Sequence, residues 1–97
     1  MKLTYMIEQD TEKTVVVFRE CKTGEIIALF PMIEYPNGTC LSYMHFGQHG
    51  EADYTHVVRS TTHVRSNETW KKCLELKEEL ELLGYNLRVQ MQRWRKR

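Results

Sequence analysis

The fold is decided by residues 66–91, SNETWKKCLELKEELELLGYNLRVQM. Ser66 is a favourable N-cap, and Gly84 is placed to end a helix in the left-handed conformation. The apolar residues between them recur at spacings of three and four: Cys73, Leu76, Leu80 and Leu83, flanked by Trp70 and Leu74. This period predicts one long amphipathic helix.

The residues after Gly84 change period. Tyr85, Leu87, Val89 and Met91 alternate with polar residues, which predicts a half-buried strand whose apolar face meets the helix. Upstream, four further segments have the length and composition of strands: residues 3–7, 14–18, 26–30 and 39–45.

Turn residues separate these strands. Gly24 and the run Tyr35-Pro36-Asn37-Gly38 predict hairpin turns, and Pro31 should end the strand 26–30 or confine its end to an edge. Gly47 and Gly50 predict a loop around Gln48-His49. Residues 52–60 fit either a short helix or an extended segment.

The sequence therefore predicts an α+β fold with the order β-β-β-β-α-β. We expect a small antiparallel sheet of four to five strands with one long helix packed on one face. Residues 1–92 should form a single α+β domain, followed by a basic C-terminal tail at 93–97.

Composition limits the classes of function. The chain has 97 residues, three cysteines without CxxC spacing, no apolar leader and no membrane-spanning run, which predicts a cytoplasmic protein with free thiols and no cofactor. Residues 88–97 hold five basic residues and no acid. The other nine basic and thirteen acidic residues give residues 1–87 a charge of −4, so the tail could attract acidic partners.

Three runs, residues 41–49, Asp53-Tyr54 and residues 83–87, resemble a group of small uncharacterised bacterial and phage-type proteins. The group shares an S-Y-M-H-x-G-Q-H stretch and a capped helix that ends in G-Y-N-L. The resemblance covers about residues 40–90, and Ser66-Asn67 stands where that group has Thr-Pro. It implies a compact single-domain protein encoded on a phage or mobile element, and it carries no catalytic residues.

The candidate site is the stretch in which polar and aromatic side chains cluster without the period of a helix or a strand. We predict a ligand or partner patch made by Tyr43, His45, Gln48, His49, Asp53 and Tyr54. A structural alternative is that Gln48 and Asp53 bond to the backbone of a folded loop while Tyr54 closes the edge of the core.

Two chemical alternatives are weaker. His45 and His49 have the i, i+4 spacing of a zinc-binding pair, but Gly47 and Gly50 argue against the helix that this geometry needs. No nucleophile elbow, phosphate loop or dinucleotide fingerprint occurs, so no catalytic residue is assigned. We expect no metal site and no enzymatic activity.

The basic tail offers an alternative function. Its residues Arg93, Trp94, Arg95, Lys96 and Arg97 combine phosphate-binding charge with an aromatic ring that can stack on a base. The leading prediction is a non-enzymatic binding or accessory module that acts through protein contacts or self-association. Nucleic-acid binding through the tail is the runner-up.

Overall fold

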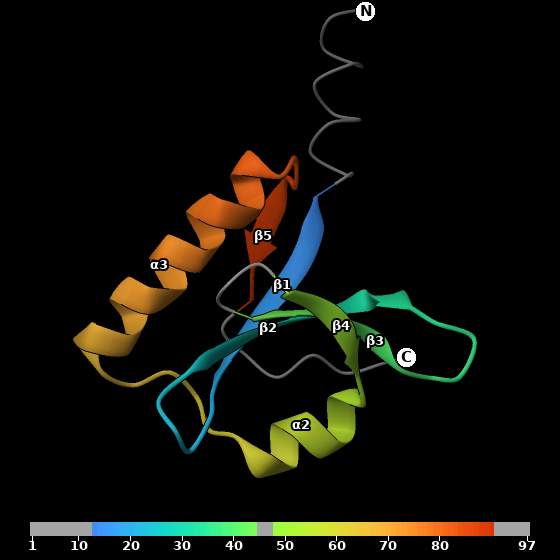
Figure 1. Ribbon diagram of the computed structural model, residues 1–97, viewed down its shortest axis with the longest axis horizontal. Helices are drawn as coiled ribbons and strands as arrows, with labels where there is room; N and C mark the ends of the chain where they lie inside the picture. Colours follow the sequence, from blue (N-terminus) through green and yellow to red (C-terminus); the bar gives the residue numbers. More distant parts are fainter. Residues whose placement is uncertain (1–12, 45–47, 91–97) are drawn as a thin grey trace, which may run out of the picture.

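The computed structural model describes residues 13–44 and 48–90. Their elements follow the order β1 (Thr14–Glu20), β2 (Ile26–Glu34), β3 (Cys40–Met44), β4 (Gln48–Ala52), α2 (Tyr54–Ser60), α3 (Asn67–Leu82) and β5 (Leu87–Val89). The α+β class is confirmed (Figure 1). The strand expected at residues 3–7 lies outside the described residues.

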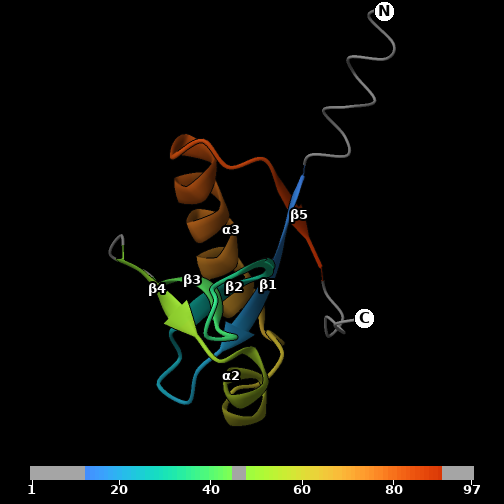
Figure 2. The ribbon, with the colours of Figure 1, turned by 90° about the vertical axis from the view of Figure 1, so that its right-hand side faces the viewer.

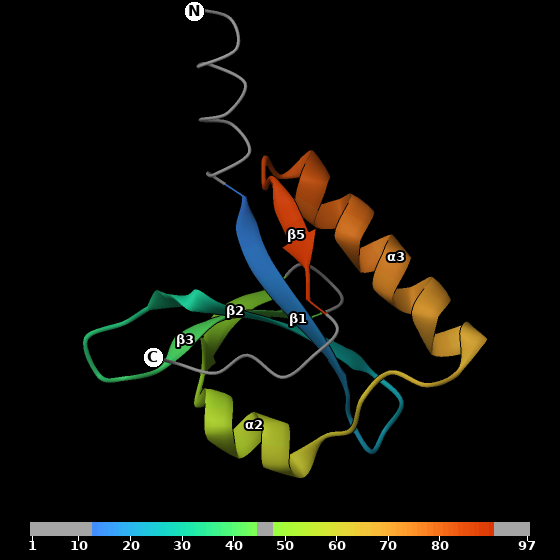
Figure 3. The same ribbon diagram turned by 180° about the vertical axis from the view of Figure 1, so that it is seen from behind.

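The strands form one sheet in the order β4-β3-β2-β1-β5. β1 to β4 are consecutive antiparallel neighbours, whereas β5 pairs with β1 in parallel, so the expectation of a purely antiparallel sheet is wrong. The parallel pairing follows from the path of α3, which carries the chain back to the end of the sheet where β1 begins (Figure 1). Seen from behind, β5 lies directly beside β1 (Figure 3).

The face of the sheet under α3 holds the larger core. Alternate residues of β1 and β2 pack there against the apolar stripe of α3 and against Leu87 of β5. The strand residues are Val16, Phe18, Ile26, Ala28 and Phe30, and the helix residues are Cys73, Leu76 and Leu80. Cys73 and Leu80 are fully buried, as the spacing of the stripe predicts.

The opposite face holds a second core. It contains Val15, Val17, Ile27, Leu29, Cys40 and Ala52, with Tyr54, Val57 and Val58 of α2 packed against it. The expectation of one helix on one face is therefore incomplete. Because β1 and β2 are apolar on both faces, both faces must be covered, and the short helix α2 covers the second.

β2 runs straight through Pro31 to Glu34, so the expectation that Pro31 ends this strand, or confines it to an edge, is wrong. The strand is central, between β1 and β3. By alternation from Leu29, the nitrogen of Pro31 faces β1, and the pairing with β1 ends at Leu29, so no bond of that ladder needs the missing N–H.

The segment around Gly50 is also different from the expectation. Residues 48–52 form the strand β4, which pairs with β3 over its whole length, and not a loop. The ambiguous segment that follows resolves as the helix α2. Turned by 90°, the molecule shows β4 at the edge of the sheet away from β5 (Figure 2).

The ends of α3 agree with the sequence. Ser66 Oγ accepts a hydrogen bond from the Thr69 N–H at 3.1 Å, and Gly84 has φ +105°. The expectation that Leu83 belongs to the buried stripe is wrong, because the helix ends at Leu82 and Leu83 is its C-cap residue, 58% exposed.

Candidate functional site

Two residues of the predicted patch meet on the α3 side of the sheet. Tyr43 of β3 and His49 of β4 are directly opposite in the ladder, and their rings make an edge contact at 4.7 Å between centroids. His49 Nε2 lies 3.0 Å from the hydroxyl of Tyr85, which stacks on Phe30. The exposed His49 ring is thus held between two tyrosines.

Tyr43 is a structural member of this group. Its side chain is almost fully buried, and its hydroxyl donates a hydrogen bond to Glu79 of α3. Burial and the neighbouring Glu79 carboxylate raise the pKa of Tyr43 to about 12. The hydroxyl therefore stays protonated at neutral pH and joins α3 to the sheet.

The last two residues of the predicted patch lie at the other face. Asp53 is the N-cap of α2, where its side chain accepts a hydrogen bond from the His56 N–H at 3.2 Å. Tyr54 packs against the second core. Asp53 thus bonds to the first turn of a helix and not to a folded loop, whereas Tyr54 packs against the core as the structural alternative expects. The rings of Tyr54 and of the Tyr43–His49 pair lie on opposite faces of the sheet.

Other predicted positions lie partly or wholly outside the described residues. The structure does not describe His45 or the basic tail, which consists of Arg93, Trp94, Arg95, Lys96 and Arg97. Of Gln48, only the backbone is described. Nucleic-acid binding by the tail stays a prediction.

The backbone of β4 offers a binding edge. Cys21 N–H donates to Glu25 O at 2.8 Å, which makes this a hydrogen-bonded pair of the β1–β2 ladder. Along an antiparallel ladder, hydrogen-bonded pairs alternate with pairs that are not hydrogen-bonded. A residue whose N–H and C=O groups bond to the strand on one side therefore directs neither group to the strand on the other side. Counting across the sheet in the observed registers, Gly50 bonds to β3, whereas His49 and Glu51 turn their N–H and C=O groups outward.

A groove of about 440 Å³ lies beside this edge, on the α2 side. Its apolar wall comes from Ile27, Met44, Ala52 and Val57, and its polar groups come from Ser42, His49, Gly50, Glu51, Asp53 and His56. The volume falls within the ~300–1,000 Å³ range of ligand pockets. Asp53, His56 and Val57 line the groove, whereas His49 and Glu51 border it with their backbone, because alternation with Gly50 and Ala52 directs their side chains to the α3 side of the sheet.

Hydrogen bonds fix the charge of one rim residue. Glu51 accepts hydrogen bonds from the Thr39 hydroxyl at 2.7 Å and from the Asn37 amide at 3.0 Å. These bonds, that from Thr39 first, lower the pKa of Glu51. The Glu51 carboxylate therefore remains ionised at neutral pH.

Arg19 positions the helix that walls the groove, and it was not among the predicted site residues. It is 5% exposed, and its guanidinium donates to Val58 O at 2.9 Å and to Thr61 O at 2.8 Å. Nε also donates to Thr61 Oγ1 at 2.9 Å, and NH1 lies 3.3 Å from His63 Nδ1. A detectable signal was present, because Arg19 shares the strand face of Val15 and Val17 and thus interrupts an apolar series.

The thiols show no sign of activation. Cys21, Cys40 and Cys73 are free, and burial is the main cause that raises the pKa of each, for Cys73 to about 11. Among residues 13–44 and 48–90, no three histidine, cysteine, aspartate or glutamate side chains are grouped so that they could hold a metal ion. Within the same part of the chain, no helix is long and apolar enough to cross a membrane.

Comparison with known proteins gives no further guide. No protein-family model matches this chain, and neither the curated proteins nor the solved structures include a match. The resemblance to phage-type proteins stays a prediction, and the site must be interpreted from its own geometry.

Proposed function

We propose that this protein is a non-enzymatic binding module that captures an extended segment of a partner protein along β4. One observation carries the proposal: an exposed strand edge lies beside a groove. The backbone N–H and C=O groups of His49 and Glu51 point away from β3, and these residues border the groove that α2 walls. A peptide added to such an edge gains affinity from main-chain hydrogen bonds and specificity from alternate side chains in the adjacent groove.

The chemistry of the groove suggests what the segment contains. One side chain of an added strand would point to the α2 side, toward the apolar wall of Met44 and Val57. The carboxylate of Asp53 at the rim favours a basic residue next to it. We therefore expect an extended segment that pairs an aliphatic or aromatic residue with lysine or arginine.

The edge also lacks common protection against pairing. Natural edge strands often carry lysine, proline or a bulge, whereas β4 has the sequence QHGEA and pairs with β3 in unbroken register. Among the described strands, β3 is the one neighbour of β4. An edge of this kind supports strand addition.

A proline scan of the edge tests the proposal. Peptides selected from a random phage-displayed library against the wild-type protein would be measured by calorimetry against Glu51→Pro and Glu51→Ala. Glu51→Pro removes an outward N–H and leaves the β3 ladder intact, so the fold should persist while affinity falls at least about tenfold. Glu51→Ala is the matched control for loss of the carboxylate, and it should retain binding to peptides that lack basic residues.

A second variant tests the groove. Val57→Asp places a charge on the apolar wall and should abolish binding of the same peptides. Light scattering of the wild-type protein and of each variant reports self-association. Equal affinity of the wild-type protein and Glu51→Pro would refute strand addition. Selected peptides that perturb no amide resonance of β4 would refute the site itself.

A further inference from the structure

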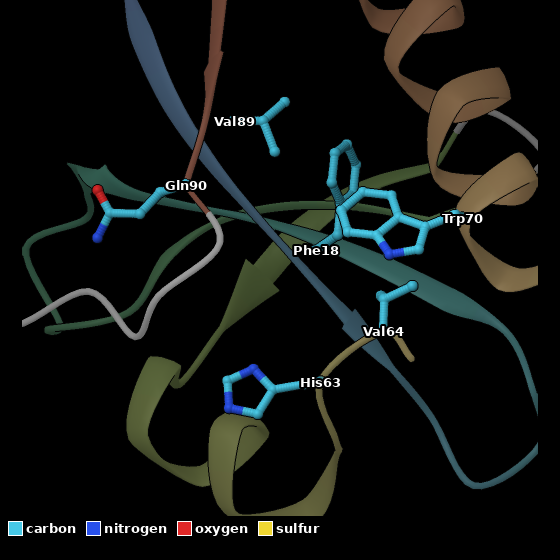
Figure 4. Close-up of a pocket in the computed structure, with 6 residues that line it drawn as sticks. All are labelled: Phe18, His63, Val64, Trp70, Val89 and Gln90. Atoms are coloured by element: carbon cyan, nitrogen blue, oxygen red, sulfur yellow. The ribbon is translucent and has the colours of Figure 1, made fainter. Parts of the chain in front are cut away.

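The two edges of the sheet differ in the length of strand that they offer. β5 forms one edge with three residues, and further along β1 Glu20 already exchanges hydrogen bonds with Thr62. The cleft at that edge, between Phe18, Trp70 and Val89, has a volume of about 60 Å³ (Figure 4), far below the ~300 Å³ at which ligand pockets begin. The opposite edge, β4, has five residues in unbroken register with β3. β4 is therefore the edge that favours pairing with another strand.

A second copy of β4 fits this edge when the two strands run antiparallel and meet at Gly50. His49 and Glu51 direct their backbone N–H and C=O groups away from β3, so a facing strand must present residues of the same kind. With Gly50 at the centre, His49 lies opposite Glu51 of the second copy, and Glu51 lies opposite its His49. Each of these pairs would exchange backbone hydrogen bonds in both directions, and the whole of β4 takes part.

Other symmetric registers are less favourable. A pairing centred on His49 leaves only residues 48–50 of β4 paired with one another, and a pairing centred on Glu51 leaves only residues 50–52. The second of these also places two Glu51 carboxylates directly opposite each other, and like charges in that position are destabilising. In the register centred on Gly50, by contrast, each carboxylate faces a histidine, which can donate a hydrogen bond to it.

We infer that β4 pairs with β4 of a second copy, centred on Gly50, and that this pairing closes the strand edge when no peptide is bound. A two-fold axis would join the two sheets, so that the contact is closed and does not propagate into a filament. The closure rests on the proposed function, because the peptide and the second copy compete for the same backbone groups of His49 and Glu51. Five residues on each side are few against the ~20–30 of a stable interface, so the dimer dissociates on dilution.

A disulfide tests the register. Gly50 would face its own copy in a pair without direct hydrogen bonds, where Cα atoms lie ~4.5 Å apart, within the ~4.4–6.8 Å that a disulfide spans. A Cβ at Gly50 would lie 3.5 Å from Ser42 Oγ, an ordinary contact, so Gly50→Cys should fold. In a Cys21→Ser background, oxidised glutathione should link Gly50→Cys into a dimer. Glu51→Cys is the matched control, because its diagonal separation of ~7–8 Å is too long, and it should link at least about tenfold more slowly.

Hydrogen exchange of the wild-type protein tests the backbone without any variant. The amides of His49 and Glu51 should exchange at least about twofold more slowly at ~1 mM than at ~10 μM protein, because the dimer bonds them. The Gly50 amide is the internal control, since it is bonded to β3 in monomer and dimer alike. Rates for His49 and Glu51 that do not change with concentration would overturn the inference.

Peptide binding separates the closure from the proposed function. The apparent affinity of the wild-type protein for the selected peptides should fall at least about twofold between ~10 μM and ~1 mM protein, because the dimer must dissociate first. Linkage of Gly50→Cys no faster than that of Glu51→Cys, with peptides still bound along β4, would overturn the dimer and leave the proposed function standing. Peptides that bind without perturbing β4 would refute the proposed function, and with it the closing role of the dimer.

Discussion

Replacing Arg19 by alanine tests how the second face of the sheet is held. The guanidinium donates to two backbone carbonyls, Val58 O and Thr61 O, at the C-terminal end of α2, where helix carbonyls lack partners and the helix dipole favours a cation. α2 has no fully buried residue of its own. Its position therefore depends strongly on this one side chain.

The magnitude follows from the hydrogen bonds lost. Charge-assisted hydrogen bonds contribute ~1.5–3 kcal/mol each. Since α2 is largely exposed, water can replace part of what Arg19 supplies, so the lower value applies to each of the two carbonyl bonds. Arg19→Ala should reduce the free energy of unfolding by about 3 kcal/mol, a large part of the ~5–15 kcal/mol of a typical domain. Arg19→Lys keeps the charge without the fork and should cost about half as much.

Urea denaturation followed by circular dichroism measures these differences, with hydrogen exchange of the α2 amides as a local readout. Arg59→Ala is the matched control, because Arg59 is an exposed arginine in the last turn of the same helix, and it should change stability by less than ~1 kcal/mol. The reasoning fails if Arg19→Ala is no more destabilising than Arg59→Ala, or if protection of α2 is unchanged.

Three further predictions concern other parts of the fold. Ser66→Ala should lower stability by about 1 kcal/mol through loss of the α3 cap, whereas Ser60→Ala should have a smaller effect in the same thermal melt. The pKa of Tyr43 is raised from 10.0 to about 12 in the folded state, so its contribution to stability is complete below about pH 10 and is lost as pH rises toward 12. Alkaline urea titrations should show this fall in the wild-type protein and a smaller one in Tyr43→Phe. A thiol reagent should modify half-buried Cys21 first, and Cys21→Ser should abolish that fast phase, leaving two thiols that react only on unfolding.

Local signals predicted much of the fold correctly. The N-cap at Ser66, the left-handed glycines at Gly24, Gly38 and Gly84, and the stripe through Leu76 and Leu80 are all observed. Each depends on residues within a few positions of one another, for which the preferences of caps, turns and helix faces are strong. The errors occur where a distant segment changes the outcome, as at Pro31, beyond which β2 continues because it still pairs with β3 at Glu34.

The candidate site was predicted only in part for the same reason. The stretch from Tyr43 to Tyr54 was predicted as one patch, but a strand and a helix start within it, and the sheet divides its described side chains between two faces. His49 and Asp53 both border the groove, but the His49 ring lies on the other face of the sheet, against Tyr43. Its wall at Val57 depends on the docking of α2 through Arg19, 38 positions or more away in the chain, which no local pattern encodes.

By itself, then, the sequence determined the class of fold, the helix α3 with its caps, and the strand pairs joined by tight turns, because these depend on neighbouring residues and on the period of apolar side chains. Only the tertiary structure decided that β5 pairs in parallel with β1, that α2 covers the second face, and that β4 is an edge with a groove beside it. These features depend on which surfaces remain to be buried once the local elements have formed, and that competition is settled only when the whole chain is packed.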